Sequence, residues 1–334
     1  MKDKVFVIAE AGVNHNGNID LAKELILKAS MAGADAIKFQ SFCADKLVLN
    51  NAKKANYQIE NSNDKEETQY DLLKKLELGK KDIFELNNYA KEKNIMFISS
   101  PFDLDSIDIL KQINMPIYKI PSGEINNVPY LRKIGKLRKK IFLSSGMCNL
   151  EEISFALNIL RNEGSKDIVV LHCNTEYPTH FEDVNLKAML QIRDKFNVDI
   201  GYSDHTLGIE VPIAAAALGA KVIEKHFTLD RDMDGPDHKA SLEFEELKNM
   251  ILAIRNIETC LGDGVKKVSD SERKNMNLVR KSIVAKRDIK RNEIFSDDNI
   301  AAKRPASGIS VAFWDDVIGC IAKRDFKKDE MIEL

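Results

Sequence analysis

Short apolar segments recur along most of the chain and alternate with amphipathic helical patterns. The eight segments cover residues 5–10, 36–40, 95–100, 117–122, 140–145, 167–173, 198–203 and 221–227. Between them, apolar residues return at helical spacing, as Leu21, Leu25 and Ile26 do. Eight successive strand and helix repeats predict an α/β protein built on a closed (β/α)8 barrel.

A doubly wound open sheet is the structural alternative to a barrel. That fold normally begins with a glycine-rich phosphate turn after its first strand. No GxGxxG sequence follows residues 5–10. This absence and the repeat count favour the barrel.

The pattern of apolar and polar residues changes after the eighth repeat. From residue 282, short apolar runs alternate with charged, turn-forming residues, which is typical of a compact, irregular β-rich module. We therefore predict a barrel domain at residues 1–262, a linker at 263–281 and a small second domain at 282–334.

The interval between residues 40 and 95 is longer than one helix requires. Its first part, residues 41–80, is rich in Lys, Asp, Glu and Asn, which favours a solvated surface. A second interpretation is an inserted loop over the mouth of the barrel, and such a loop is a candidate lid.

Composition narrows the functional classes. The 50 basic and 52 acidic side chains give a net charge of −2, which does not favour nucleic acid as a partner. Five scattered cysteines without CxxC spacing indicate reduced thiols and a cytoplasmic protein. The apolar run near the N-terminus is too short for a signal segment or a membrane span.

Polar residues follow nearly every predicted strand, and in a barrel these strand ends converge on one mouth. Two of them are His205, in GYSDHTLG (201–208), and His226, in VIEKHFTLD (222–230). Two imidazoles do not close a metal site, so a bound cation would keep positions open for substrate. The pair predicts a catalytic metal site, although each histidine alone is also typical of an ordinary buried hydrogen bond.

Two lysines at the strand ends, Lys38 and Lys119, suit a phosphate. Hydroxyl groups at neighbouring strand ends add further hydrogen-bond donors: Ser100, Ser122, Ser144 and Ser203. Each serine alone is also interpretable as a strand-end cap, but together they predict an anion site.

Two carboxylates, Glu10 and Glu124, are candidates for proton transfer, with surface or capping roles as the alternative. A cation, a phosphate site and paired carboxylates in one mouth fit a metal-assisted addition to a carbonyl group. The predicted reaction class is therefore a condensation.

The motifs, taken together, resemble the sialic acid (nonulosonate) synthase family across essentially the whole chain. They are IAEAGVNHNG (8–17), IKFQS (37–41), YKIPSGEINN (118–127), LSSGM (143–147), LHCNTEYPT (171–179), GYSDHTLG, EKHFTLD and GPDH (235–238). The tail, with SIVAKRDIKRNEI and KRPASGIS, is similar to the family's C-terminal antifreeze-like (SAF) domain.

The resemblance implies a reaction that joins phosphoenolpyruvate to the open-chain form of an N-acylated mannosamine-type sugar, consuming water and releasing phosphate. It implies that His205 and His226 bind a divalent metal, Mn²⁺ with Mg²⁺ or Co²⁺ as alternatives, and that Glu124 handles protons as water adds. The residues that match phosphoenolpyruvate-binding positions are Lys38, Ser100, Lys119, Ser122, Ser144 and Ser203.

The resemblance also assigns residues to the sugar. Four of these lie in the barrel: Glu10, Gln40, Tyr177 and Asp237. Arg304 matches an arginine that the SAF domain inserts into the barrel of the partner subunit, which implies a domain-swapped homodimer. From the residues alone, a solvated loop charge is the preferred interpretation of Arg304.

Two motifs depart from neuraminic acid synthases: KFQS and RPASG stand where those enzymes often have KHQT and RPGNG. Phe39 indicates a more apolar environment, suited to 2,4-diacetamido-2,4,6-trideoxymannose and its product N,N'-diacetyllegionaminate. Synthesis of N-acetylneuraminate from N-acetylmannosamine, or of pseudaminate, is the alternative within the family. A non-catalytic carbohydrate-binding protein is the alternative from another class. The roles of His15, His172 and Glu224 stay open.

Overall fold

The computed structural model describes residues 4–55, 58–59 and 67–334. The chain divides into two compact units, Met1–Gly262 and Asp263–Leu334. The second unit thus begins within the predicted linker, where α12 (Asp270–Val279) forms behind a capping box of Ser269 and Glu272.

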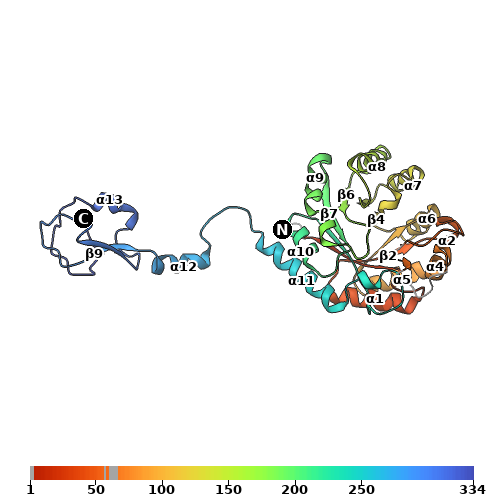
Figure 1. Cartoon of the computed structure of the whole chain (residues 1–334), viewed down its shortest axis with the longest axis horizontal. Helices are drawn as coiled ribbons and strands as arrows, with labels where there is room; N and C mark the ends of the chain where they lie inside the picture. The colour runs from red at the N-terminus through yellow and green to blue at the C-terminus, as the bar shows by residue number, and fades with distance from the viewer. Residues whose placement is uncertain (1–3, 56–57, 60–66) are drawn as a thin grey trace. The chain divides into compact units, whose positions relative to one another are not determined.

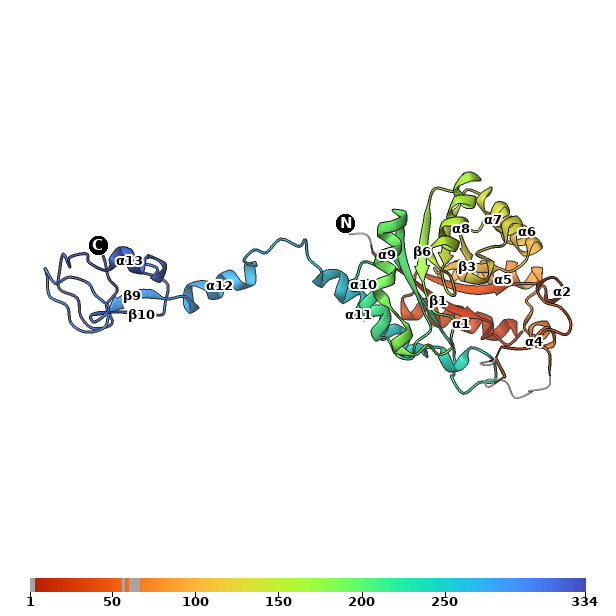
Figure 2. The same ribbon diagram turned by 45° about the horizontal axis from the view of Figure 1, so that its top comes forward.

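The larger unit is a nearly closed parallel barrel (Figures 1 and 2). Its strands pair in the order β3-β2-β1-β8-β7-β6-β5-β4. They are β1 (Phe6–Gly12), β2 (Ala36–Ser41), β3 (Met96–Pro101), β4 (Ile117–Ile120), β5 (Lys140–Ser144), β6 (Ile168–His172), β7 (Asp199–Asp204) and β8 (Val222–His226). The predicted fold class is confirmed.

Helices surround the strands (Figure 2). They are α1 (Ile19–Ala32), α5 (Lys80–Glu92), α6 (Leu104–Gln112), α7 (Val128–Gly135), α8 (Leu150–Asn162), α9 (Leu186–Phe196), α10 (Glu210–Ala217) and α11 (Phe244–Cys260). Local sequence sets their ends and their faces: α8 starts at a capping box of Asn149 and Glu152 and buries Ile153, Leu157 and Leu160.

Alternation along the strands separates the helix-facing core from the barrel mouth. On β2, Phe39 packs against the ring of Phe97 on β3, while Lys38 and Gln40 line a cavity. On β8, Lys225 forms a fully buried ion pair of 2.5 Å with Asp204 of β7. Alternate residues of these two strands therefore line the cavity.

The described part of the interval after β2 forms α2 (Ala44–Leu47) and α4 (Gln69–Leu76). A capping box of Thr68 and Asp71 starts α4. Leu72 and Leu76 of α4 are buried in a small apolar cluster with Val13 and Phe42. These leucines correct the interpretation of the whole interval as solvated surface.

The smaller unit is a compact module with little regular structure. Its antiparallel strands are β9 (Ser282–Ala285) and β10 (Ile300–Lys303), and isolated bridges such as Ile289 to Phe326 tie in the rest. A short helix, α13 (Trp314–Val317), completes it. Its core includes Ile283, Phe295 and Phe326. The predicted irregular β-rich module is confirmed.

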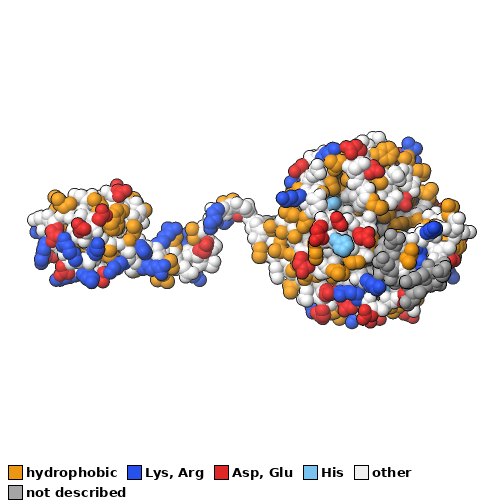
Figure 3. Space-filling model, viewed as in Figure 1, with side chains coloured by type: hydrophobic (Ala, Val, Ile, Leu, Met, Phe, Trp, Pro, Cys, Tyr) orange, Lys and Arg blue, Asp and Glu red, His pale blue; other side chains and the backbone are white. Residues whose placement is uncertain are grey.

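Acidic and basic side chains are intermixed on the visible face of the larger unit (Figure 3). Among the described residues, no helix has the length and apolar character needed to cross a membrane. All five cysteines are free thiols.

Candidate active site

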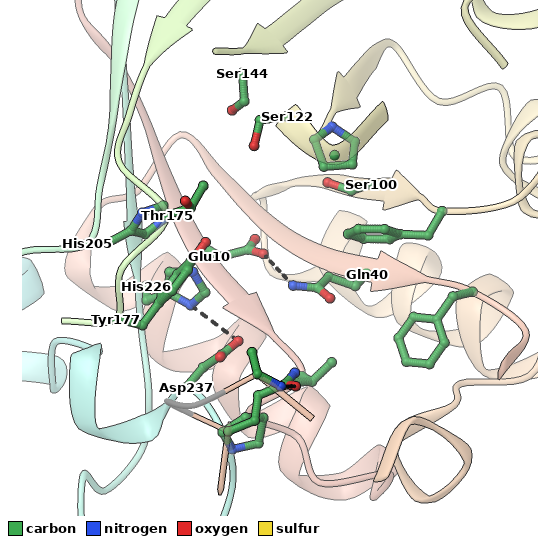
Figure 4. Close-up of a pocket in the computed structure, with 18 of the residues that line it drawn as sticks. Glu10, Gln40, Ser100, Ser122, Ser144, Thr175, Tyr177, His205, His226 and Asp237 are labelled. Carbon is green, nitrogen blue, oxygen red and sulfur yellow. Dashed lines mark hydrogen bonds and ion pairs between the residues drawn. The ribbon is translucent and has the colours of Figure 1, made fainter. Parts of the chain in front are cut away.

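A cavity of about 470 Å³ opens at the carboxyl ends of the barrel strands. It gathers most of the residues singled out in the sequence (Figure 4). These are Glu10, Lys38, Gln40, Ser100, Lys119, Ser122, Ser144, Tyr177, Ser203, His205, His226 and Asp237. The structure therefore brings the proposed metal, phosphate and sugar residues into one space.

The two histidines lie side by side, with ring centroids 5.4 Å apart. His205 donates from Nδ1 to the carbonyl oxygen of Asn174 at 2.6 Å, which leaves the lone pair on Nε2. His226 Nδ1 is buried, has no hydrogen-bond partner among the described residues, and lies 3.8 Å from a carboxylate oxygen of Asp237. The Tyr177 ring packs against both imidazoles.

Electrostatics keep both imidazoles neutral. Burial lowers the pKa of His205 to about 4 and the pKa of His226 well below its ordinary value. A divalent cation requires neutral imidazole ligands with available lone pairs. The unpartnered His226 nitrogen and the fixed His205 tautomer therefore fit the implied metal.

The two lysines belong to a buried network with two carboxylates. Lys38 Nζ lies 2.8 Å from Glu10 Oε1 and 3.9 Å from Glu224 Oε1, and Lys119 Nζ lies 2.7 Å from Glu224 Oε1. Ser203 donates to the same Glu224 oxygen at 2.9 Å, and Lys38 donates to a serine of β3, Ser100, at 3.1 Å. The lysines are thus charge-balanced by carboxylates.

Glu224 is the residue whose role the sequence left open. Its position on β8, two residues before His226, was the available signal, because residues i and i+2 share one face of a strand. Burial opposes its charge, but Lys119 and Lys38 outweigh burial and lower its pKa. Glu224 is the fixed counterion of the site.

Glu10 behaves in the opposite way. Burial raises its pKa to about 7, with Lys38 acting against that shift and the Glu224 charge adding to it. Of two neighbouring carboxyl groups, one therefore stays ionised while the other titrates near neutrality. Such a split is typical of sites in which one carboxyl group exchanges protons.

A bulge in β1 brings the proposed sugar-facing groups together. The pairing of β1 with β2 shifts between Glu10 and Gly12, and Gly12 has a left-handed φ of +53°. A Cβ atom there would lie 3.3 Å from Glu10 Oε1, 3.4 Å from Gln40 Nε2 and 3.5 Å from Asp237 Oδ2. The three polar atoms converge on the space that glycine leaves empty.

Two of the predicted site residues lie outside the cavity lining. Glu124, in the 3-10 helix Ser122–Glu124, is half-buried and accepts a hydrogen bond from Asn127 at 2.5 Å. Burial raises its pKa. Arg304 is exposed in the smaller unit. The roles assigned to both residues stay predictions.

Phe39 does not face the cavity, which corrects the inference that it makes the sugar environment apolar. Only 1% of it is exposed, and it packs against Phe97 and His15 in the core. His15 accepts a hydrogen bond from the backbone of Gly17 at 3.0 Å, and His172 donates to the carbonyl oxygen of Val184 at 2.9 Å. Both histidines have local structural contacts.

A second group of potential metal ligands lies outside the cavity. Ligand atoms of Cys43, Asp45 and Glu77 lie within 4.8 Å of one another. Asp45 already accepts hydrogen bonds from Tyr70 at 2.7 Å and from Lys74 at 3.1 Å. We assign no cation to this cluster.

Fold and cavity together define a barrel synthase with an appended module, and the comparisons agree. The chain belongs to the NeuB family, whose model matches residues 25–266, and a SAF domain model matches residues 280–333.

Two relatives and one solved structure give more detail. The chain is 56% identical over 331 residues to the N,N'-diacetyllegionaminic acid synthase of Campylobacter jejuni, covering 98% of this chain and 99% of the relative. It is 46% identical over 318 residues to the synthase of the same name from Legionella pneumophila, covering 94% and 89%. The crystal structure of N-acetylneuraminic acid synthetase from Leptospira borgpetersenii matches with a TM-score of 0.71 and 36% identity, over 81% of this chain and 90% of that one.

Proposed function

We propose that the protein is a nonulosonic acid synthase. It condenses phosphoenolpyruvate with open-chain 2,4-diacetamido-2,4,6-trideoxymannose and water, and it releases N,N'-diacetyllegionaminate and phosphate. The observation that carries this proposal is the single cavity in which two neutral imidazoles stand beside two buried lysines. The specific product rests on the 56% identity to a synthase of that name.

The polar floor of the cavity binds phosphoenolpyruvate. Lys38 and Lys119 supply the positive charge, and Ser100, Ser122 and Ser144 supply hydroxyl donors. The Ser203 hydroxyl, which donates to Glu224, would have to turn from that carboxylate to donate to the anion. Because Glu10 and Glu224 already balance the lysines, the incoming anion adds negative charge to a neutral network. Glu10 is the group that takes up a proton in response, since its pKa lies near 7.

His205 and His226 would hold the divalent cation, proposed to be Mn²⁺ with Mg²⁺ or Co²⁺ as alternatives. When bound, the cation supplies a Lewis acid for the aldehyde oxygen of the sugar. The Asn174 carbonyl group fixes the His205 ring, and Tyr177 packs against both imidazoles, so the ligands need little reorganisation.

The acceptor sugar lies against Glu10, Gln40, Tyr177 and Asp237. Hydrogen bonds from the three groups around Gly12 orient it, so that its aldehyde carbon meets the methylene carbon of phosphoenolpyruvate. Glu124, in the same 3-10 helix as Ser122, handles the proton when water adds to the cationic intermediate.

We also propose that the working form is a domain-swapped homodimer in which Arg304 of one subunit completes the site of the other. Exposure of Arg304 in the smaller unit leaves it available for that contact. The free cysteines support a reducing, cytoplasmic location.

Phosphate release tests the proposed reaction. The protein is incubated with Mn²⁺ and phosphoenolpyruvate, and N-acetylmannosamine, 2,4-diacetamido-2,4,6-trideoxymannose and the corresponding altrose are offered in turn. We expect the fastest release with the trideoxymannose. Faster release with another sugar would reassign the product, and no release with any sugar would favour a non-catalytic carbohydrate-binding protein.

Metal dependence is tested on the same assay. His226→Ala should leave a folded protein with little activity, whereas His180→Ala, at an exposed histidine, should behave as wild type. Full turnover by the wild-type protein in rigorously chelated buffer would refute the metal role.

A further inference from the structure

One side of the cavity is apolar and comes from chain that the proposed reaction does not use. Its side chains follow β2 and β3 or belong to α2 and α4: Phe42, Leu47, Leu72, Leu73, Leu76 and Phe102. We call these six residues the apolar wall. The cavity therefore has a charged floor and, beside it, a hydrocarbon surface that binds no ion.

The wall is firmly seated on the barrel. Phe42 and Phe102 meet edge to face, with ring centroids 6.4 Å apart. Leu72 and Leu76 stand one turn apart on α4 and are each 6% exposed. At Gly17, a Cβ atom would lie 2.3 Å from the Lys75 carbonyl oxygen, so α4 packs directly against the turn after β1.

The wall adjoins the sugar side of the cavity. Phe42 lies two residues after Gln40, which faces the proposed acceptor. His205 directly follows β7 and His226 ends β8, and β1 separates β8 from β2 in the sheet. The strand order therefore leads from the imidazoles past Glu10 and Gln40 to the wall.

Two amide side chains accompany the hydrocarbon. Gln58 and Gln69 line the same cavity, and Gln69 donates to Gln58 at 3.5 Å. An amide group beside leucine carbons matches an acetamido group, which combines one amide with one methyl. This region of the cavity is therefore complementary to an acylated, deoxygenated end of a sugar.

We propose that the apolar wall is the specificity subsite of the enzyme, and that it binds the methyl-bearing end of the acceptor. Its occupants are the C6 methyl and a neighbouring acetamido methyl of a diacetamido-trideoxy sugar. This inference rests on the proposed function. N-acetylmannosamine would instead place hydroxyl groups against carbon atoms that offer no hydrogen bond.

The degree to which an apolar pocket can discriminate between two sugars is known to an order of magnitude. One methyl-sized difference in an apolar pocket changes kcat/KM by about 10-fold to 200-fold. Truncation of one leucine should therefore lower the preference for the trideoxy sugar by about tenfold or more. Use of phosphoenolpyruvate should not change, because the lysines and serines proposed to bind it are not part of the wall.

A matched pair of leucines provides the test. Leu76 lines the cavity and is 6% exposed, whereas Leu78, 7% exposed, packs in the main barrel core and does not line the cavity. For Leu76→Ala and Leu78→Ala, kcat/KM is measured with the trideoxy sugar and with N-acetylmannosamine, together with the KM for phosphoenolpyruvate and the melting temperature. Both variants should lose stability, but only Leu76→Ala should lower the ratio of the two sugars.

A second wall variant keeps the test valid if Leu76→Ala does not fold. Leu73 is only partly buried, so Leu73→Asn should fold and should lower the same ratio by placing an amide in the wall. Ratios within about threefold of wild type in both wall variants would overturn the specificity subsite while leaving the synthase intact. A wild-type protein that uses neither sugar would instead overturn the proposed function, and the inference with it.

Discussion

Glu224→Gln is the substitution that most directly tests the charge balance of the cavity. The change keeps the size of the side chain and an oxygen that accepts from Ser203, but it removes the negative charge between the two lysines. Glu10 still pairs with Lys38 at 2.8 Å, so Lys119 is the cation that loses its partner. We expect a folded but destabilised protein.

The magnitude follows from the distances. With an effective dielectric constant of about 20, a charge pair at the 2.7 Å of Lys119 and Glu224 is worth about 6 kcal/mol, and one at the 3.9 Å of Lys38 about 4 kcal/mol. Desolvation of the carboxylate offsets several kcal/mol of that sum. We therefore expect the free energy of unfolding to fall by about 3–5 kcal/mol.

Urea unfolding in metal-free and phosphate-free buffer measures the loss. Circular dichroism is the suitable probe, because the single tryptophan, Trp314, belongs to the smaller unit. Glu85→Gln is the control, since Glu85 pairs with Lys23 at an exposed site and should change little. Inorganic phosphate should then stabilise Glu224→Gln more than wild type, because it finds two lysines with one carboxylate.

Two results would refute this reasoning. A loss of stability below about 1 kcal/mol would mean that the buried carboxylate contributes no more than a surface ion pair. Equal stabilisation of both proteins by phosphate would mean that the lysines do not form an anion site.

Three further predictions concern other parts of the site. Relative to Glu10→Gln, the metal-free wild-type protein should lose about 3 kcal/mol of unfolding free energy as pH rises from about 4.5 to about 7. The reason is that the folded state keeps a proton on Glu10 that the unfolded state releases. If urea unfolding shows the same stability difference between the two proteins across that range, the raised pKa is contradicted. Gly12→Ala and its control Gly33→Ala both place alanine at positive φ, and each should lower the free energy of unfolding by about 1–2 kcal/mol. Only Gly12→Ala should lower kcat/KM for the sugar, by at least about tenfold. Equal losses of activity in the two variants would contradict a specific role for the bulge. Mixing inactive Arg304→Ala and Glu124→Ala subunits should restore part of the activity through hybrid dimers, and no rescue would count against the swapped site.

Much of the barrel and of its mouth was predictable because both depend on local periodicity. Each strand is a short apolar run that ends in polar residues, and the observed bounds differ from the expected ones by a few residues. The extension of β1 to Gly12 was not visible, because the bulge arises from pairing with β2. Alternation along a strand puts Lys38 and Gln40 on one face, as the cavity lining shows, and the same rule excludes Phe39 from that face.

The rest depends on contacts that no local pattern encodes. Leu72 and Leu76 lie in a strongly charged stretch, and only the docking of α4 on the barrel reveals what they cover. The network around Glu224 joins strands far apart in sequence, and its charge balance emerges only when both lysines are placed. Arg304 belongs to a separate compact unit, so its role depends on assembly rather than on the fold of one chain.

The residues of the apolar wall and those of the charged floor are distributed differently along the sequence. Most of the wall is encoded by one contiguous stretch between β2 and α5, whereas the lysines, serines and histidines are dispersed over strands from β2 to β8. Exchange of that single stretch between homologues would alter which acceptors are admitted without rebuilding the reaction centre. Chimeras made by such exchange offer a direct way to diversify the range of sugars accepted by this scaffold.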